Sequence, residues 1–472
     1  MKIYRVKHPF IFTIFGASGD LARLKLFPAL YSLAEQKRLP SDYFIVGYAR
    51  TPKNNSQFQK EFSDSIKKAQ VKDLNPKILK ELIKHVHYFT GQYDNLADFK
   101  KYKLFLEKLS EKKQIPHLTY FSVPPQGFKP IIQNLGESRK NKNEDIRLII
   151  EKPFGQDEKS ADDLFHFIAR YFNEDQTYLL DHFLGKAGVQ SILNLRQTNR
   201  ILNIILQGRK IANIQITAIE SIGINNRVNY FNQVGIIKDM IQSHLLQILA
   251  LTTMSIPISE SAASLQREKY AIISAVTMPI GKNNPVIGQY KSYTKENGVP
   301  KNSRTETFAA VKMLIDQDQW YKVPIYIRTG KRLNRKQTSI VVEFKKFPFQ
   351  KKEEEPNLLI IEISPEEKVT IQLVNKYSSG KSHYETISTT KSIACSGDYC
   401  LPEHGLLLLD VMRKNKCSFL SFPEIIESWR VTESIFHTIK SKKIKLEKYD
   451  DGTVGPASQN KLTEKDGFKW HN

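Results

Sequence analysis

Short apolar segments alternate with amphipathic ones along the first third of the chain. Phe10 to Phe15 is almost entirely apolar, Tyr43 to Tyr48 repeats the pattern, and Leu21 to Gln36 between them has apolar residues at helical spacing. Further apolar runs at Thr119 to Val123 and Arg147 to Ile150 predict more strands. This rhythm predicts βαβ units in a parallel sheet, with the carboxyl ends of the strands along one edge, where ligands bind.

The pattern changes near residue 182. Val189 to Ile205 is long and apolar-periodic, and the following strands need no helical crossovers. These predicted strands are Ile211 to Ile222, Ser339 to Phe344, Leu358 to Ile363 and Val369 to Leu373. We therefore predict an α/β domain at 1–181, a Rossmann-like doubly wound parallel sheet. An α+β domain at 182–472 is expected to have a large, mostly antiparallel sheet with helices on one face. Lys345 to Pro356 is expected to form an exposed turn, and residues 453–472 a loosely held tail.

Composition narrows the class of protein. The 472 residues suffice for two domains, and 40% hydrophobic with 25% charged residues excludes fibrous and disordered chains. No run approaches the ~18 apolar residues that a membrane-spanning helix needs, and Pro9 favours a first strand over an export signal. Cys395, Cys400 and Cys417 show no paired Cys/His spacing, so neither a disulfide framework nor a zinc site is predicted. We expect a cytoplasmic protein.

The net charge is strongly positive. Lys and Arg number 71 against 49 Asp and Glu, a formal charge of +22 that attracts anions. The chain lacks a zinc finger, a basic zipper and an aromatic RNA-binding signature, so no nucleic-acid partner is predicted. Much of the excess is diffuse lysine, as in Lys440 to Lys448, which is typical of solvated faces. The charge therefore indicates a phosphorylated small molecule only where specific pockets support it.

A glycine turn, Gly16-Ala17-Ser18-Gly19-Asp20-Leu21, follows the first predicted strand. Glycine permits close approach to a ligand, and the next helix presents its N-terminus to an anion such as pyrophosphate. The spacing is Gly-x-x-Gly, so a plain turn is the alternative, but its place in the first βα unit favours a nucleotide site. Arg50 follows the second strand, where NAD-binding proteins usually carry an acid, which favours NADP; an ordinary surface arginine is the alternative.

Charged residues gather near the predicted domain junction. Glu151 to Gly155 ends a strand with a lysine and a proline, and Asp181 to Lys186 brings together an acid, an imidazole and an ammonium group. Lys238 to His244 opens an amphipathic segment, in which Asp239 and His244 are five apart and so not on one α-helical stripe. Solvated lysines and a satisfied histidine are the alternative interpretation. Together with the cationic loop from Arg328 to Lys336, these residues suit a phosphate-bearing substrate.

In order along the chain, these motifs resemble those of the NADP-dependent glucose-6-phosphate dehydrogenases. The correspondence is GASGDLAxxKL with Gly16 to Leu26, EKPFG with Glu151 to Gly155, DHYLGK with Asp181 to Lys186, RDMxQNH with Lys238 to His244, and RTGKxL with Arg328 to Leu333. Tyr449 to Pro456 also resembles the family's ending, so the resemblance covers nearly the whole chain. It implies oxidation of glucose 6-phosphate at C1 to 6-phosphogluconolactone with NADP, the first oxidative step of the pentose phosphate pathway. No metal is implied.

The resemblance also implies roles for domains and residues. Residues 1–181 would bind NADP, and residues 182–472 would bind substrate and form a homodimer or homotetramer. His244 is implied as the general base and Asp181 as the partner that orients its ring. The residues implied to bind substrate are Lys152, His182, Lys186, Glu220, Asp239, Lys331 and Lys336. The residues implied to bind the coenzyme are Gly16, Ser18, Gly19, Asp20, Leu21, Arg50, Asp94 and Lys152.

Three residues depart from the family's pattern. Phe183 stands where the family has tyrosine, Ala187 where it has an acid, and Ser243 where it has asparagine. One hydrogen bond to a charged group contributes about 1.5–3 kcal/mol, so weaker substrate binding is expected without loss of chemistry. Two alternatives stay open: another two-domain NAD(P)-dependent sugar oxidoreductase, and a non-catalytic basic scaffold that keeps the fold and binds RNA or acidic partners.

Overall fold

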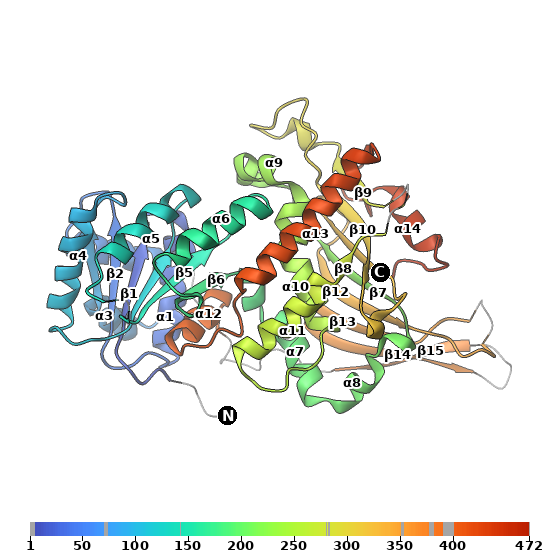
Figure 1. The fold of residues 1–472 in the computed structure, drawn as a ribbon, viewed down its shortest axis with the longest axis horizontal. Helices are drawn as coiled ribbons and strands as arrows, with labels where there is room; N and C mark the ends of the chain where they lie inside the picture. Colours follow the sequence, from blue (N-terminus) through green and yellow to red (C-terminus); the bar gives the residue numbers. More distant parts are fainter. Residues whose placement is uncertain are drawn as a thin grey trace. The chain divides into compact units, whose positions relative to one another are not determined.

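The computed structural model describes residues 5–69, 74–141, 143–279, 281, 284–350, 354–376, 382–389 and 401–471. These residues form two compact units (Figure 1). The first unit contains residues up to 185 together with residues 401–422, and the remainder forms the second. This differs from the predicted single boundary at residue 181, because helix α12 (Glu403–Met412) returns to the first unit. There it buries Leu407, Leu408 and Val411 in the core.

A parallel sheet forms the centre of the first unit. Its strands are β1 (Ile11–Phe15), β2 (Phe44–Ala49), β3 (Val86–Thr90), β4 (His117–Phe121), β5 (Ile146–Glu151) and β6 (Thr177–Leu180). They lie in the order β3-β2-β1-β4-β5-β6, and every pair is parallel. All residues of β1 and β4 are buried, as expected for central strands covered on both faces. The Rossmann-like prediction is confirmed.

Helices follow the strands of the first unit. They are η1 (Ala22–Leu26), α1 (Phe27–Glu35), α2 (Asn55–Lys68), α3 (Pro76–Lys84), α4 (Leu96–Leu109), α5 (Phe128–Glu137) and α6 (Glu158–Ala169). Several begin at a side chain that accepts a free backbone N–H group: Asn54, Asn75, Asn95 and Asp157. The predicted helix from Leu21 to Gln36 is confirmed, with the difference that its first turn, η1, is π-helical.

A larger mixed sheet forms the second unit. Its described strands are β7 (Ile211–Ile219), β8 (Val276–Thr277), β9 (Val286–Tyr290), β10 (Phe308–Ile315), β11 (Ile325–Gly330), β12 (Gln337–Phe344), β13 (Leu358–Ser364), β14 (Lys368–Lys376), β15 (Ser382–Ser388) and β16 (Leu446–Tyr449). The main order is β15-β14-β13-β12-β7-β11-β10-β9-β16, and β8 pairs with β10. Only the described pairs β7–β11 and β9–β16 are parallel, so the mostly antiparallel prediction is confirmed. Residues 345–350 form the predicted turn, whereas 351–353 lie outside the described residues.

The helices of the second unit are α7 (Ala187–Thr198), α8 (Arg200–Ile205), α9 (Val228–Ile236), η7 (Ile237–Leu245), α10 (Leu246–Thr253), α11 (Ala262–Ser274), α13 (Phe422–Ser441) and α14 (Asn460–Glu464). One helical stretch, Val228–Thr253, which is kinked at Gly235, is long and apolar enough to cross a membrane. In its most apolar window 83% of the residues are buried inside the protein, which is typical of a core helix. Lys269 of α11 pairs with Glu424 of α13 at 3.0 Å and donates to Gln247 of this stretch at 3.1 Å.

The prediction of a loosely held tail is wrong. The backbone of the final segment is held to β7, since the side chain of Gln215 donates to Lys469 O at 2.8 Å and accepts from His471 N–H at 2.9 Å. The Trp470 ring lies 4.4 Å from the guanidinium carbon of Arg328. Of the three cysteines, Cys417 lies half-buried in the first unit, and Cys395 and Cys400 lie outside the described residues.

Candidate active site

The predicted residues of the first unit follow the carboxyl ends of its strands. Gly16 follows β1, Arg50 follows β2, Asp94 comes shortly after β3, Lys152 follows β5 and Asp181 follows β6. Because all these strands are parallel, their carboxyl ends lie along the same edge of the sheet. The topology thus brings the candidate coenzyme residues to one edge.

The glycine turn is shaped for close backbone approach. Gly16 has φ of 83°, and its N–H donates to Tyr48 O at 2.9 Å. A Cβ on Gly16 would lie 2.1 Å from Ser122 O, so only glycine fits this position. Gly19 N–H donates to Gly16 O at 2.9 Å, and the helix begins directly afterwards, at Asp20. A tight turn before a helix N-terminus fits the pyrophosphate of a dinucleotide.

Arg50 is exposed at the end of β2, and its guanidinium carbon lies 5.6 Å from the centre of the Tyr93 ring. Asp94, beside that tyrosine, is also exposed. An exposed guanidinium group packed loosely on one ring is accessible to a phosphate group. The residues present therefore fit a dinucleotide.

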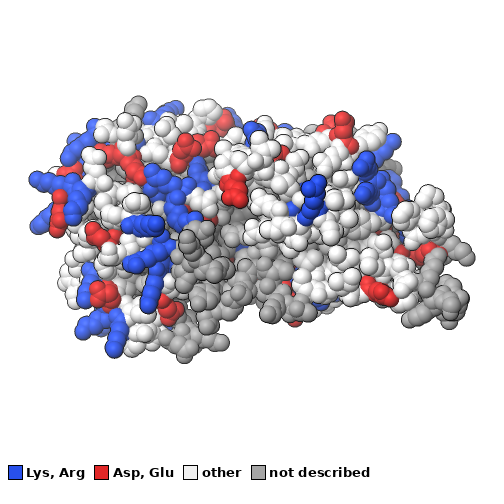
Figure 2. Space-filling model, turned by 90° about the horizontal axis from the view of Figure 1, so that it is seen from below, with Lys and Arg blue, Asp and Glu red and all other residues white. Residues whose placement is uncertain are grey.

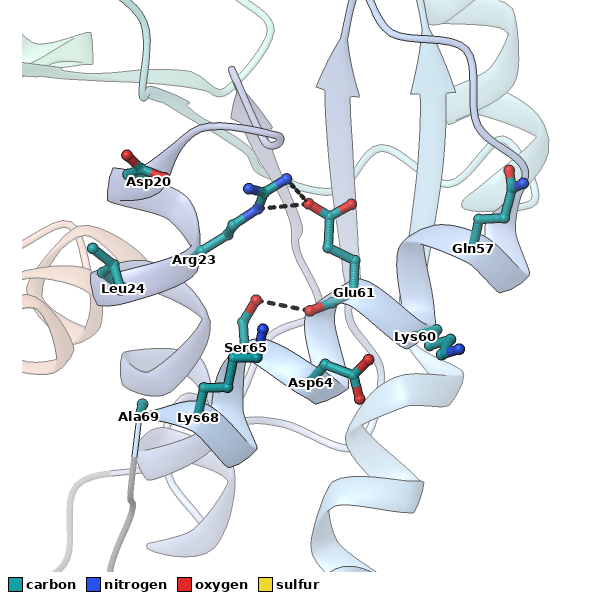
Figure 3. A pocket seen from close by; sticks show the side chains of 10 residues that line it. All are labelled: Asp20, Arg23, Leu24, Gln57, Lys60, Glu61, Asp64, Ser65, Lys68 and Ala69. Carbon is teal, nitrogen blue, oxygen red and sulfur yellow. Dashed lines mark hydrogen bonds and ion pairs between the residues drawn. The ribbon is translucent and has the colours of Figure 1, made fainter.

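A pocket of about 420 Å³ lies between the start of η1 and helix α2 (Figure 3). The exposed Asp20 lies at its rim. Glu61 of α2 is held by Arg23, whose Nε donates to Glu61 Oε1 at 2.6 Å, and by an ion pair between Lys53 and Glu61 Oε2. Because Glu61 is already paired with these cations, we assign the pocket no ligand.

The residue before Lys152 is held by two side chains that the sequence did not reveal. Glu151 accepts a hydrogen bond from the hydroxyl of Tyr120, and its Oε1 lies 3.5 Å from Nε2 of His404. Burial raises the pKa of Tyr120 well above its ordinary value. His404 belongs to α12, far along the chain, so no local pattern could have indicated it.

Asp181 is fully buried, whereas the neighbouring His182 is exposed. Asp181 Oδ1 accepts from the backbone N–H of Phe183 at 2.9 Å, and the backbone carbonyl of Asp181 accepts from Leu184 N–H at 3.0 Å. The first bond fixes the carboxyl group and the second fixes the backbone at the start of the turn His182–Gly185. A buried carboxyl group held by a backbone amide is suited to orient a second polar group.

In the second unit, an acid and a lysine meet at the ends of two neighbouring strands. Glu220 follows β7 and Lys331 follows β11, and these strands pair in parallel with Ile219 opposite Gly330. Lys331 Nζ lies 2.5 Å from Glu220 Oε2 and 5.4 Å from the centre of the Phe231 ring. Lys331 is buried and Glu220 is half-buried, so this ion pair is partly shielded from solvent.

Asp239 and His244 both lie on η7, a π-helical segment, and both are buried. In a π-helix the backbone bonds join residues five apart, so two residues at that spacing face a similar direction. This differs from the sequence expectation, which assumed an α-helix. Tyr230 OH donates to Asp239 Oδ1 at 3.4 Å, and Arg227 Nη2 lies 3.9 Å from the same oxygen. Neither partner was predicted.

The remaining predicted residues lie at the margins of these elements. Lys186 precedes the first residue of α7 and is half-buried. Lys336 is exposed, between β11 and β12. Figure 2 shows basic side chains next to acidic ones on one face of the molecule, in keeping with the diffuse lysine of the sequence.

The first unit has a doubly wound sheet with a glycine turn that fits a diphosphate, and the second has a large mixed sheet. This combination defines a two-domain dinucleotide-binding oxidoreductase fold. Two family profiles match the chain: glucose-6-phosphate dehydrogenase, NAD binding domain, over residues 13–191, and glucose-6-phosphate dehydrogenase, C-terminal domain, over residues 193–471. The chain belongs to the glucose-6-phosphate dehydrogenase family. The resemblance seen in the motifs is confirmed.

Individual relatives match along their full length. Glucose-6-phosphate 1-dehydrogenase of Bacillus subtilis is 34% identical over 491 residues, covering 98% of each chain. The crystal structure of the Mycobacterium avium enzyme has 29% identity and a TM-score of 0.86, with 98% of each chain covered. A glucose-6-phosphate dehydrogenase in complex with its substrate glucose-6-phosphate has 28% identity and a TM-score of 0.90, with 100% of each chain covered.

Proposed function

We propose that this protein oxidises glucose 6-phosphate at C1 to 6-phosphogluconolactone with NADP, the first oxidative step of the pentose phosphate pathway. The observation that carries the proposal is family membership across the whole chain, together with the retention of His244 and Asp181 in their motifs. NADP, when bound, supplies the nicotinamide C4 that accepts the hydride. The glycine turn Gly16–Leu21 and Asp94 would bind its diphosphate and ribose portions, Lys152 would contact coenzyme and sugar, and Arg50 would hold the 2′-phosphate.

The proposed proton transfer uses His244 as the general base. A ring nitrogen of His244 takes the proton of the C1 hydroxyl while the C1–H bond breaks with its electron pair, which leaves C1 as the lactone carbonyl. Asp181 orients the imidazole and stabilises its protonated form. The buried, backbone-fixed carboxyl group of Asp181 supports this role.

The proposed substrate residues divide by charge. Glu220 and Asp239 accept hydrogen bonds from sugar hydroxyl groups, while the 6-phosphate is bound by cations: His182, Lys186, Lys331 and Lys336. The ion pair between Lys331 and Glu220 supports a shared site for sugar and phosphate, since it sets an acid and a cation side by side at the ends of two neighbouring strands.

A steady-state assay of the purified protein tests the proposal. We expect reduced coenzyme with glucose 6-phosphate and NADP, and a lower kcat/KM by ~100-fold or more with unphosphorylated glucose, because the cations lose their partner. NAD in place of NADP checks the coenzyme preference. Absence of reduced coenzyme with glucose 6-phosphate and either nucleotide would refute the proposal. Equal turnover of glucose would favour a different sugar oxidoreductase.

We also propose a homodimer or homotetramer in the cytoplasm, following the family resemblance. Exposed apolar side chains on the outer strands of the second unit, Leu373 and Ile387, support self-association. The small number of cysteines supports a reducing compartment. Light scattering on a sizing column measures the mass, and a monomer at micromolar concentration would contradict the assignment.

A further inference from the structure

The helical stretch that carries the proposed base is broken at Gly235. This residue adopts φ of 68° and ψ of 172°, which separates α9 from η7. A Cβ on Gly235 would lie 2.2 Å from Glu306 Oε1, so the carboxyl group of Glu306 occupies the space beside the glycine. A left-handed residue that also lies against a carboxyl group has to be glycine.

Glu306 accepts hydrogen bonds from the first two backbone amides after the break. Ile236 N–H donates to the Glu306 backbone oxygen at 3.0 Å, and Ile237 N–H donates to Glu306 Oε1 at 3.3 Å. The first turn of a helix has amides without an intrahelical partner, and a carboxylate there also interacts favourably with the helix dipole. Glu306 thus caps the helix from a position 69 residues further along the chain.

The capped segment carries two residues of the proposed site, Asp239 and His244, both buried. Because η7 is π-helical, its side-chain directions depend on the residue at which its wider turns begin. We propose that Glu306 is a positioning residue: by fixing the start of η7 it sets the orientation of Asp239 and His244 for the proposed reaction. This inference rests on the proposed function.

The electrostatic setting gives the cap a pH dependence. Burial raises the pKa of Glu306 to about 7, while the Ile237 N–H group and the charge of Lys238 favour its ionised form. The charge of Glu306 also contributes to the raised pKa of Tyr293, on the turn Tyr293–Lys295. A carboxylate accepts a hydrogen bond more strongly than a neutral acid does, so the cap becomes firmer as pH rises through neutrality.

The test compares Glu306→Ala with Glu306→Gln in the full chain. Glu306→Ala should lower kcat about 10- to 100-fold and raise KM for glucose 6-phosphate, because small misplacements of reacting groups are costly. KM for NADP should stay unchanged, since the proposed coenzyme residues belong to the first unit. Glu306→Gln keeps a side-chain oxygen that accepts from Ile237 N–H and should retain most of kcat.

Glu343→Gln is the matched control, because Glu343 is another acid of the second unit with a fixed partner: it bonds to His471 at 2.8 Å, outside the proposed site. It should leave both KM values and the pH profile unchanged. Should Glu306→Ala fail to fold, the pH profile of Glu306→Gln decides: we expect a shallower fall of kcat/KM below pH 7 than in the wild type. An identical profile, or wild-type kinetics in Glu306→Ala, would overturn the inference. An inactive wild type would instead refute the proposed function.

Discussion

The two units present their candidate residues in different ways. In the first unit most of them lie on turns after parallel strands, and Arg50, Asp94 and His182 are exposed. In the second unit His244 and Lys331 are buried, on the π-helical segment and at a strand end that meets its acid partner. Exposed groups on turns can adapt to a ligand, whereas buried groups with fixed partners hold one geometry. Substitutions of site residues in the second unit should therefore lower activity more than those in the first unit.

The largest effect is expected for the buried base. His244→Ala should lower kcat about 10³- to 10⁴-fold, because general-base catalysis contributes this much in favourable cases. KM for both substrates should change little, since the lost interaction forms during proton transfer. His182→Ala is the matched control: an exposed histidine of the first unit, expected to raise KM for glucose 6-phosphate and to leave kcat nearly intact. Equal losses of kcat in both variants would contradict the comparison.

Lys331 tests the ion pair that this residue forms with Glu220 in the second unit. Lys331→Ala should raise KM for glucose 6-phosphate about 100-fold, because it removes a cation and leaves the Glu220 carboxylate unpaired. Lys312→Ala breaks another lysine–acid pair of the same unit, with Asp466, and should not affect KM. Initial rates at varied sugar phosphate measure both. A KM for Lys331→Ala within the range of the control would remove Lys331 from the substrate site.

Arg50 tests the exposed edge of the first unit. Arg50→Ala should lower kcat/KM for NADP about 10- to 100-fold and leave the value for NAD unchanged, because one charge-assisted contact with the 2′-phosphate is lost. Arg139→Ala is a suitable control, because the guanidinium carbon of Arg139 also lies over an aromatic ring, 4.3 Å from the centre of Phe172. An unchanged preference for NADP in Arg50→Ala would refute the assignment.

The two units should also differ in the pH dependence of their stability. Burial lowers the pKa of His117 in the first unit to about 3, and its Nε2 lies 2.9 Å from Thr13 Oγ1. The folded state then binds fewer protons than the unfolded one below pH ~6.5, so the free energy of unfolding falls as pH falls, by about 2 kcal/mol down to pH ~5. Glu306, with its raised pKa of about 7, has the opposite effect. Its contribution to the free energy of unfolding is present below pH 4.5 and is lost as pH rises through 7.

Denaturant unfolding of His117→Gln at pH 7 and pH 5 measures the first of these contributions. The variant removes the titrating group, so it should lose less stability than the wild type on acidification, although it is less stable at pH 7. A pH dependence equal to that of the wild type would show that His117 is not the group responsible.

Local patterns predicted most of the fold because periodicity and strand length are local properties. The predicted strands Phe10 to Phe15 and Tyr43 to Tyr48 agree with β1 and β2 to within one residue at each end. The tail was misjudged because its stabilising contacts, such as Trp470 against Arg328, join residues far apart in sequence. The return of α12 to the first unit has the same cause, since burial against a distant core leaves no local signature.

The candidate site was predictable where residues follow strand ends and unpredictable where distant side chains support them. The positions of Gly16, Arg50 and Lys152 follow from the parallel sheet alone. The capping of η7 by Glu306 and the contact of Glu151 with His404 could not be predicted, because neither pair is close in sequence. The π-helical geometry of η7 was not predicted either, because its amphipathic pattern resembles that of an α-helix.

The smallest predicted effect concerns Phe183, the departure nearest to the exposed His182. Phe183→Tyr should lower KM for glucose 6-phosphate by up to about 10-fold with kcat unchanged, because the added hydroxyl group can donate to the phosphate. Phe183 is buried, so a hydroxyl without a partner would instead cost stability, and the melting temperature distinguishes the two outcomes. An unchanged KM with a lower melting temperature would show that this ring packs in the core of the first unit and has no role in binding the substrate phosphate.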